Sequence, residues 1–332
     1  MPPMIWDIVG QEWAVALLRR GLETGRMAHA YLFAGPPQVG KTRLARILAQ
    51  ALNCVQPDPP CGKCTSCHKI EQQVHPDVRL IEGEGSGGSI RIEQIRTLQH
   101  EAVLSPYEGR RRVFILRHMD LATVEAANCL LKTLEEPPHF VTLILTAVEA
   151  DLLPSTVVSR CQRLDLRPVA RHEIETALQA RGLAAEKAQL LARLSGGRVG
   201  WALQAAGDPA VLEHRQQGLE QLAGLLAADR VERLEYAYKI GRDSDACRDL
   251  VELWATWWRD LLVLRGHGEE HLLNVDGAGN LRAWSAQASV PAARSILAAL
   301  QDTAAQLQAN VNTRLAMEGL LLKLPHWQEP AS

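Results

Sequence analysis

Eight consecutive residues near the start of the chain have the composition and spacing of a phosphate-binding loop. The stretch Gly35-Pro36-Pro37-Gln38-Val39-Gly40-Lys41-Thr42 matches the pattern G-x-x-x-x-G-K-[ST] in full. In such a loop the backbone N–H groups face the phosphates, the lysine reaches the terminal phosphates and the threonine hydroxyl binds Mg²⁺. The sequence therefore predicts a site for ATP or ADP with Mg²⁺, and the expected binding residues within the loop are Gly35, Pro36, Gln38, Val39, Gly40, Lys41 and Thr42.

The strand expected to supply an acidic partner for Mg²⁺ is followed by basic residues. P-loop NTPases hold the ion partly through a carboxylate at the end of a second strand. The apolar run Val113–Leu116 suits this strand, yet Arg117 and His118 follow it. Because a guanidinium would repel the ion, we expect a weak Mg²⁺ site in a chain that binds nucleotide but hydrolyses it poorly.

Three acidic residues are alternative positions for the missing carboxylate. Asp77 and Glu82 flank the apolar run 78–81 and would serve if that run were the strand in question. Asp120 lies past the expected end of the other strand, which makes it a poor substitute. The run of apolar residues favours 113–116 as the strand in question, although no acidic residue directly follows it.

Four of the seven cysteines form a group with the spacing C-x6-C-x2-C-x2-C, at Cys54, Cys61, Cys64 and Cys67. Turns of the C-x2-C kind bring thiolates to one tetrahedral ion, and four thiolates suit structural zinc. Since protein ligands fill all four positions, a catalytic zinc with an open position is disfavoured. Disulfides and an iron–sulfur cluster are the alternatives. The neighbouring His68 and His75 are expected at the surface.

Short strands and helices alternate over the first half of the chain and position these groups. The apolar run Ala30–Ala34 predicts a strand before the phosphate loop, and Arg43–Leu52 has helical periodicity after it. This alternation implies a mostly parallel sheet with helices on both faces. After Pro168 only helical periodicity remains. We therefore predict an α/β P-loop domain over residues 1–166 with a zinc knuckle at 54–67, a small helical domain over 167–207 and an all-α domain over 208–327.

Composition excludes some classes of protein. The 332 residues carry a net charge of −2, which gives no general attraction to nucleic acid or membrane. No apolar run approaches the ~20 residues of a membrane span, and no signal peptide opens the chain, so a cytoplasmic location is expected. Trp254, Trp257 and Trp258 recur at helical spacing and predict a helix-packing core rather than a base-stacking surface. The glycine-rich stretch Gly83–Ser89 predicts a flexible loop.

Several stretches together resemble the clamp-loader branch of the AAA+ ATPases, over nearly the whole chain. They are Trp6–Gln11 ahead of the first helix, His29–Gly35 leading into the phosphate loop, the cysteine knuckle, Leu130–Pro138, Ser159-Arg160-Cys161 and Asn310–Pro325. The resemblance is to bacterial clamp-loader subunits in particular. It implies an AAA+ P-loop domain followed by a lid domain and a helical collar domain.

The resemblance also assigns roles to single residues. Arg160 is implied as an arginine finger that acts in trans on ATP bound by a neighbouring subunit. Thr146, at the end of its strand, falls at the sensor-1 position and joins the expected nucleotide contacts. The second sensor is usually an arginine, but the best register puts Gly200 at that site, with Arg198 two residues away. This departure is expected to weaken nucleotide sensing.

The function implied by the resemblance is that of a stator subunit in the bacterial replicative clamp loader, a component of the DNA polymerase III holoenzyme. The implied partners are the motor subunits (gamma or tau) and a delta subunit in a hetero-oligomeric ring. The sliding clamp and primer-template DNA would be reached through the complex, and no membrane is involved. A motor subunit should keep an Asp-Glu pair at Arg117 and His118, which this chain lacks. The alternatives are an active clamp-loader ATPase that uses His118 or Asp120, and a nucleotide-stabilised DNA-binding regulator.

Overall fold

The computed structural model describes residues 6–83, 88–309 and 311–327, and the chain divides into two compact units. The first unit extends to Glu173 and includes residues 197–200. The second comprises residues 174–196 and the chain from Trp201 onward. The three domains with boundaries at residues 166 and 207 stay a prediction. Residues 84–87 of the predicted flexible loop, and Asn310 of the C-terminal stretch, lie outside the described residues.

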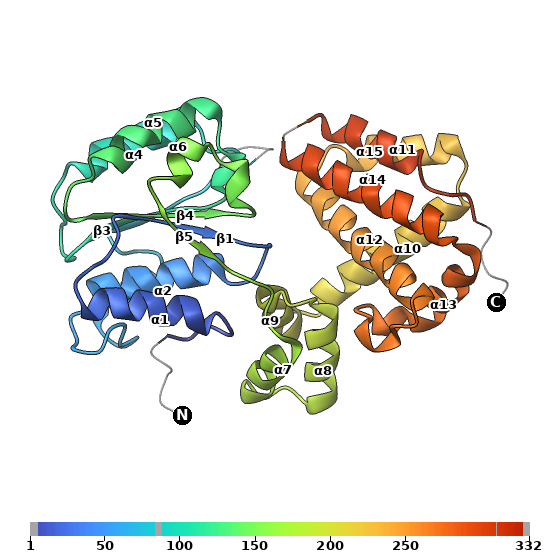
Figure 1. Cartoon of the computed structure of the whole chain (residues 1–332), viewed down its shortest axis with the longest axis horizontal. Helices are drawn as coiled ribbons and strands as arrows, with labels where there is room; N and C mark the ends of the chain where they lie inside the picture. The colour runs from blue at the N-terminus through green and yellow to red at the C-terminus, as the bar shows by residue number, and fades with distance from the viewer. Residues whose placement is uncertain (1–5, 84–87, 310, 328–332) are drawn as a thin grey trace. The chain divides into compact units, whose positions relative to one another are not determined.

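The first unit is built on a parallel sheet, as the alternation of strands and helices predicts (Figure 1). Within the described residues the sheet has five strands in the order β2-β3-β4-β1-β5, and every neighbouring pair is parallel. The strands are β1 (Ala30–Ala34), β2 (Val78–Ile81), β3 (Arg112–Leu116), β4 (Val141–Ala147) and β5 (Gln162–Asp165). Strands β1 and β4 are buried along their whole length, as expected at the centre of a sheet covered on both faces.

Helices cover both faces of this sheet (Figure 1). Their bounds, with two short 3-10 turns, are α1 (Glu12–Glu23), α2 (Lys41–Asn53), α3 (Thr65–Glu71), α4 (Ile92–Ala102), η1 (Met119–Leu121), α5 (Val124–Glu135), η2 (Ala150–Leu152) and α6 (Ser155–Val158). One face carries α1 and α2, and the other carries α4 and α5. Helix α3 packs on α2, and α6 packs on α5. The predicted α/β fold with helices on both faces is confirmed.

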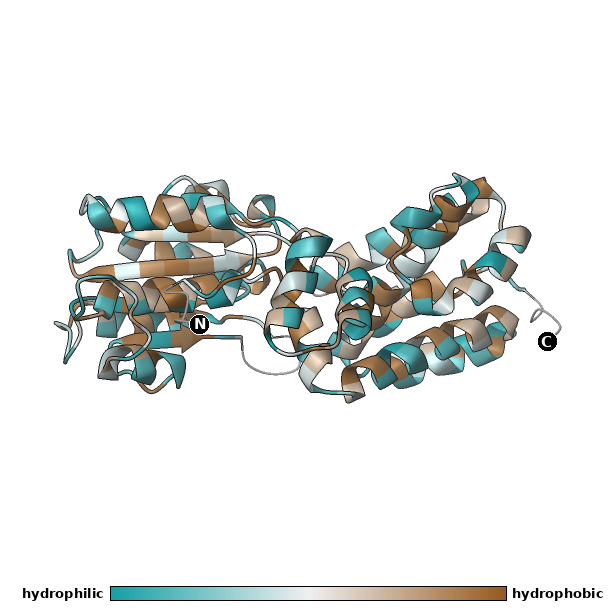
Figure 2. Cartoon of the chain, turned by 90° about the horizontal axis from the view of Figure 1, so that it is seen from below, coloured by the Kyte–Doolittle hydropathy of each residue, from teal (hydrophilic) through white to brown (hydrophobic). Residues whose placement is uncertain are grey.

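The two faces of the sheet hold separate apolar cores. Along β3, Val113 and Ile115 join the core beneath α1 and α2, while Phe114 and Leu116 join the core beneath α4 and α5. This alternation is the period of two that a strand imposes on its side chains. Figure 2 shows the strands largely in brown, the colour of hydrophobic residues. A residue that follows Leu116 in the same alternation is directed to the face that carries α2.

Parallel pairing brings the carboxyl ends of the central strands to one edge of the sheet. Phe33 of β1 lies opposite Thr146 of β4, and Leu116 of β3 lies opposite Leu145 of β4. The phosphate loop, the residues after β3 and Thr146 therefore meet at this edge, which is where open α/β sheets bind ligands.

The chain after β5 is helical, as predicted. Its elements are α7 (Arg171–Ala180), α8 (Ala185–Leu194), α9 (Val199–Gly207), α10 (Ala210–Ala227), α11 (Arg230–Ile240), α12 (Ser244–Arg265), η3 (Glu269–His271), η4 (Val275–Gly277), α13 (Ala278–Gln287), α14 (Val290–Gln308) and α15 (Thr313–Leu321). Trp254, Trp257 and Trp258 of α12 lie buried in the core of the second unit, which confirms their predicted packing role. None of the described helices is long and apolar enough to cross a membrane.

Candidate nucleotide site and cysteine cluster

The phosphate loop has the backbone conformation that its glycines permit. Gly35 and Gly40 have φ of 148° and 107°, in a region that side chains rarely allow. A Cβ atom on Gly35 would lie 2.3 Å from the carbonyl oxygen of Leu166, so only glycine fits there. Gln38 also has a positive φ, of 58°. The loop connects β1 to α2, and the predicted order of strand, loop and helix is confirmed.

Lys41 is held inside this loop at the first turn of α2. Its side chain is buried, and its Nζ donates to the carbonyl oxygens of Gly35 and Pro36, the second at 2.7 Å. Val39 is fully buried and anchors the loop to the core. A buried ammonium group, a curled backbone and a helix N-terminus are the groups that bind phosphate in such loops. These residues therefore fit ATP or ADP, and their roles as ligands stay predictions.

Thr146 links the loop edge to the exit of β3. It is buried at the end of β4, and its Oγ1 accepts a hydrogen bond from the N–H of His118 at 3.2 Å. His118 has a positive φ of 54°, so the chain turns sharply where β3 ends. The structure thus brings the predicted sensor-1 residue together with the strand end that lacks an acid.

The exit of β3 carries positive charge. Arg117 forms an ion pair with Glu82, the residue that follows β2. Burial lowers the pKa of His118 below its ordinary value, and the charge of Arg117 lowers it further, so His118 is neutral at pH 7. Mg²⁺ prefers carboxylate oxygens and water as ligands. The two residues at this strand end do not fit that ion.

The three alternative acids occupy different positions. Asp77 precedes β2 and therefore lies at the opposite edge of the sheet from the phosphate loop. Glu82 is at the correct edge but is paired with Arg117. Asp120 belongs to η1, and among the described residues its buried Oδ1 has no hydrogen-bond partner. Asp120 is therefore the remaining candidate for an acid near this edge.

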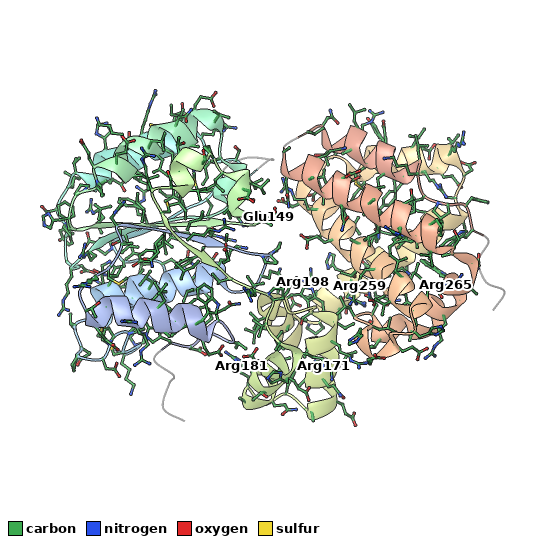
Figure 3. All side chains as sticks on the ribbon, viewed as in Figure 1. Glu149, Arg171, Arg181, Arg198, Arg259 and Arg265 are labelled. Carbon is green, nitrogen blue, oxygen red and sulfur yellow. The ribbon has the colours of Figure 1, made fainter. Side chains whose placement is uncertain are left out.

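Gly200, at the predicted sensor-2 position, touches the phosphate loop through its backbone. Its N–H donates to the carbonyl oxygen of Gln38 at 2.8 Å. A Cβ atom on Gly200 would lie 3.1 Å from that oxygen and 3.2 Å from the Gln38 Cβ, which is tighter than ordinary contact. An arginine here would displace the loop. Arg198, labelled in Figure 3, is half-buried just before α9.

Arg160 stands at the surface just after α6. Its Nη2 lies 2.6 Å from Oε1 of Glu135, and its Nη1 donates to the carbonyl oxygen of Thr156 at 2.9 Å. The side chain remains 35% exposed, so a neighbouring molecule can reach its guanidinium. The arginine-finger role of this residue stays a prediction.

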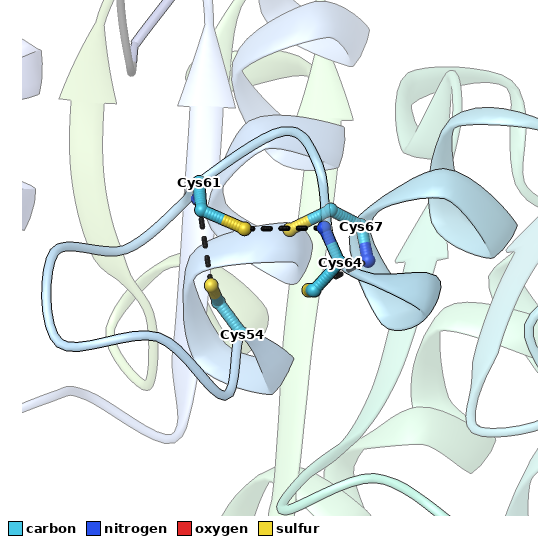
Figure 4. Close-up of side chains that lie close together, drawn as sticks. All are labelled: Cys54, Cys61, Cys64 and Cys67. Carbon is cyan, nitrogen blue, oxygen red and sulfur yellow. Dashed lines mark hydrogen bonds between the residues drawn. The ribbon is translucent and has the colours of Figure 1, made fainter.

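The four grouped cysteines converge at one point (Figure 4). The Sγ atoms of Cys54, Cys61, Cys64 and Cys67 all lie within 4.8 Å of one another. Sulfur atoms around tetrahedral zinc, with Zn–S bonds of about 2.3 Å, are separated by about 3.8 Å. Backbone N–H groups also point at the sulfurs: those of Cys61, Cys64 and Cys67 donate to Sγ of Cys54, Cys61 and Cys64. The four-thiolate set fits a structural zinc ion.

Ionisation of the cysteines differs from one to the next. Burial raises the pKa of Cys54 and of Cys67. Burial also opposes ionisation of Cys64, but the N–H groups of Cys67 and Val55 outweigh it and lower the pKa of Cys64 to about 7. A bound cation would favour the thiolate form of all four.

The cysteine cluster is joined to the helix of the phosphate loop. Gln50 of α2 donates to the carbonyl oxygen of Cys67 at 3.0 Å, and Arg43 of α2 pairs with Glu71 of α3 at 2.6 Å. The expectation that His75 lies at the surface is wrong, because its side chain is buried and contacts Ser66 Oγ at 3.1 Å. Sequence spacing gave no signal of this contact.

Comparison with known proteins gives consistent matches. A family model described as "DNA polymerase III, delta subunit" matches residues 10–170. The DNA polymerase III subunit tau of Escherichia coli (strain K12) is 36% identical over 243 residues, which cover 69% of this chain and 37% of that protein. The DNA polymerase III subunit delta' of Bacillus subtilis (strain 168) is 29% identical over 321 residues, which cover 95% of this chain and 96% of that protein.

The extent of these matches differs. The chain spans 37% of the length of the tau relative and nearly all of the delta' relative. A crystal structure of a DNA polymerase III gamma subunit-related protein from Thermotoga maritima has a TM-score of 0.45 at 19% identity, covering 92% of this chain and 97% of that chain. That structural similarity is too low to support a statement about function.

Freshly purified protein should contain about one zinc ion per chain, because four thiolates form a closed tetrahedral site. Elemental analysis measures this content directly. The double variant Cys61→Ser/Cys64→Ser should lose the metal, while Cys129→Ser, outside the cluster, should keep it. Metal-free wild-type protein, or iron in place of zinc, would contradict the assignment.

Asp77→Asn should lower the free energy of unfolding at pH 7 by ~1–3 kcal/mol. The buried Asp77 carboxylate accepts from the backbone N–H groups of Tyr107, Glu108 and Gly109. Burial raises the pKa of Asp77, but these donors and Arg112 outweigh it and hold that pKa below its ordinary value.

Because the folded-state pKa of Asp77 is depressed, its stabilisation is present above the unfolded pKa and is lost as pH falls through the folded pKa. The difference between wild type and Asp77→Asn should therefore shrink toward acid pH in urea unfolding curves. Asp151→Asn is the matched control, since that side chain is 92% exposed. A difference that stays constant from neutral to strongly acid pH would contradict the role of the carboxylate.

Proposed function

The chain belongs to the clamp-loader family of DNA polymerase III subunits, which acts in DNA replication, and we propose that it is the stator of that assembly, the delta-prime subunit. The observation that carries this choice is the ion pair of Arg117 with Glu82 at the end of β3. The residue after β3 is therefore the cation Arg117, at the position where a motor subunit needs a carboxylate. The delta' relative matches 95% of this chain, against 69% for the tau relative, and this supports the same choice.

The proposed stator binds nucleotide but hydrolyses it poorly. The loop around Lys41 fits the phosphates of ATP or ADP, with weak binding of Mg²⁺ at most. Hydrolysis needs a metal bridging the phosphates and a residue that orients the attacking water. The positive charge of Arg117 repels the metal ion. The backbone N–H of His118 donates a hydrogen bond to Oγ1 of Thr146. At the sensor-2 position, the backbone N–H of Gly200 contacts the loop, and no arginine side chain is present there.

The second half of the proposal concerns Arg160. An arginine at a transferring phosphoryl group neutralises the charge that develops there, and it can be supplied by a neighbouring subunit. Arg160 is partly exposed and its guanidinium is held by Glu135, which orients the side chain before a partner arrives. In this proposal the guanidinium of Arg160 exchanges its ion pair with Glu135 for contacts to the phosphates of ATP bound by the neighbouring subunit.

These properties fit a fixed position in a ring. The chain would assemble with gamma or tau motor subunits and a delta subunit, through its C-terminal helices, in the cytoplasm. The ring would open the sliding clamp when the motors bind ATP, and primer-template DNA would trigger the hydrolysis that releases the clamp. The clamp and the DNA are partners of the complex rather than of this chain alone.

One observation favours an active ATPase instead. Asp120 has a buried Oδ1 without a hydrogen-bond partner among the described residues. Its negative charge also raises the pKa of His118, although burial and Arg117 outweigh that effect. Asp120 bound to Mg²⁺ would give a clamp-loader motor with an unusual metal site.

Arg160→Ala should leave the assembled clamp loader intact but reduce its DNA-stimulated ATPase. An arginine finger is worth ~10³–10⁵ in kcat at the site it serves, so the neighbouring ATP site should become almost inactive. ATP turnover and clamp loading are measured on the complex reconstituted with its motor and delta subunits. The assembly itself is followed by size-exclusion chromatography.

Arg163→Ala is the matched control, because Arg163 is also a surface arginine and pairs with Asp165 at 2.7 Å. That variant should behave as wild type. Wild-type ATPase in the Arg160→Ala complex would refute the finger role, and loss of assembly would make Arg160 an interface residue instead.

A further inference from the structure

The side chain of Arg117 belongs to the face of the sheet that carries the phosphate loop helix. Val113 and Ile115 of β3 pack on the α2 side, and Arg117 continues their alternation. The backbone keeps strand pairing as far as this residue, since its N–H donates to the carbonyl oxygen of Ile81 at 2.9 Å. Arg117 therefore lies on the same face of the sheet as α2, whose N-terminus follows the phosphate loop.

The guanidinium of Arg117 has unused donors on this side. Its described partner is Glu82, whose carboxylate is 46% exposed and follows β2 at the margin of the sheet. Its Nε is buried and has no hydrogen-bond partner among the described residues. A guanidinium carries five N–H donors. Donors therefore remain for an anion that enters from the side of the loop.

The surrounding charges favour such an anion and disfavour a cation. Lys41 and the N-terminus of α2 add positive charge at the same edge. Both Lys41 and Arg117 shift His118 toward its neutral form. Of the nearby carboxylates, Glu82, which follows β2, is engaged by Arg117, and Asp120 of η1 acts on His118 against the two cations. A divalent cation placed here would meet the positive charges of Lys41 and Arg117, with Asp120 as the one carboxylate among these described residues that keeps an unpartnered oxygen.

In a phosphate loop the metal ion neutralises the phosphate oxygens. A guanidinium can neutralise the same oxygens through paired hydrogen bonds, without a metal. We propose that the phosphate loop of this chain holds a nucleoside diphosphate or triphosphate without a divalent cation, and that Arg117 binds its terminal phosphate in place of Mg²⁺. Glu82 competes with the phosphate for Arg117. This inference rests on the proposed binding of nucleotide and adds its chemical form and a further binding residue.

Titration of the full chain with fluorescent N-methylanthraniloyl-ADP, in EDTA and in Mg²⁺, tests this directly. Wild-type affinity should be unchanged within error when EDTA replaces Mg²⁺. Arg117→Ala should bind about tenfold or more weakly in EDTA, the loss expected for charge-assisted hydrogen bonds. Glu82→Gln should bind more tightly than wild type, because it releases Arg117. Arg110→Ala removes an exposed arginine ahead of β3 and should bind as wild type.

Arg117→Asp places a carboxylate at the strand end, so its binding should fall in EDTA and recover when Mg²⁺ is added. Thermal unfolding checks that each variant is folded. If Arg117→Ala is unfolded, the affinity of Glu82→Gln for the nucleotide tests the proposal instead. An affinity of Glu82→Gln equal to that of wild type would then overturn the proposal.

Wild-type binding that requires Mg²⁺ would overturn this inference and leave nucleotide binding by the stator intact. Arg117→Ala with wild-type affinity in EDTA would do the same. Failure of wild type to bind in either buffer, or equal binding by Lys41→Ala, would remove the nucleotide from the proposed function as well. The two failures are therefore distinguishable.

Discussion

The charge at the carboxyl end of β3 is the constraint on which the site depends. The parallel sheet brings this strand end, the phosphate loop and Thr146 to one edge. Chemistry that uses Mg²⁺ needs a negative group there, and Arg117 supplies a positive one. The loop around Lys41 does not depend on Arg117, because its geometry comes from glycines and from the hydrogen bonds that the Lys41 side chain donates to backbone carbonyls. In the stator that we propose, binding of phosphate is thereby separated from its hydrolysis.

Two other features attach neighbouring segments to the loop and to its helix. Gly200 donates to Gln38, and a Cβ atom on Gly200 would lie 3.1 Å from the carbonyl oxygen of Gln38, so the start of α9 is placed directly against the loop. On the other side of α2, the cysteine cluster is attached through Gln50. The contact at Gly200, like the missing carboxylate, supports the stator that we propose.

Local spacing predicted the phosphate loop, the cysteine cluster and the alternation of strands and helices. Each of these depends on residues that are close in sequence, such as Gly35 and Gly40 or Cys61 and Cys64, and the structure confirms their placement. The missed features depend on contacts between distant segments. Burial of His75, the anchoring of residues 107–109 by Asp77, and the Gly200 contact arise only when the sheet assembles. The amino-acid pattern at those positions carries no periodic signal.

ATP turnover by the purified chain, measured with Mg²⁺ on a sample whose bound nucleotide is quantified at the same time, tests the central claim most directly. A nucleotide-holding stator should show bound nucleotide and a turnover rate no higher than that of Lys41→Ala. Turnover well above that background would contradict it, and would show that a group such as Asp120 performs the role that Arg117 and His118 cannot.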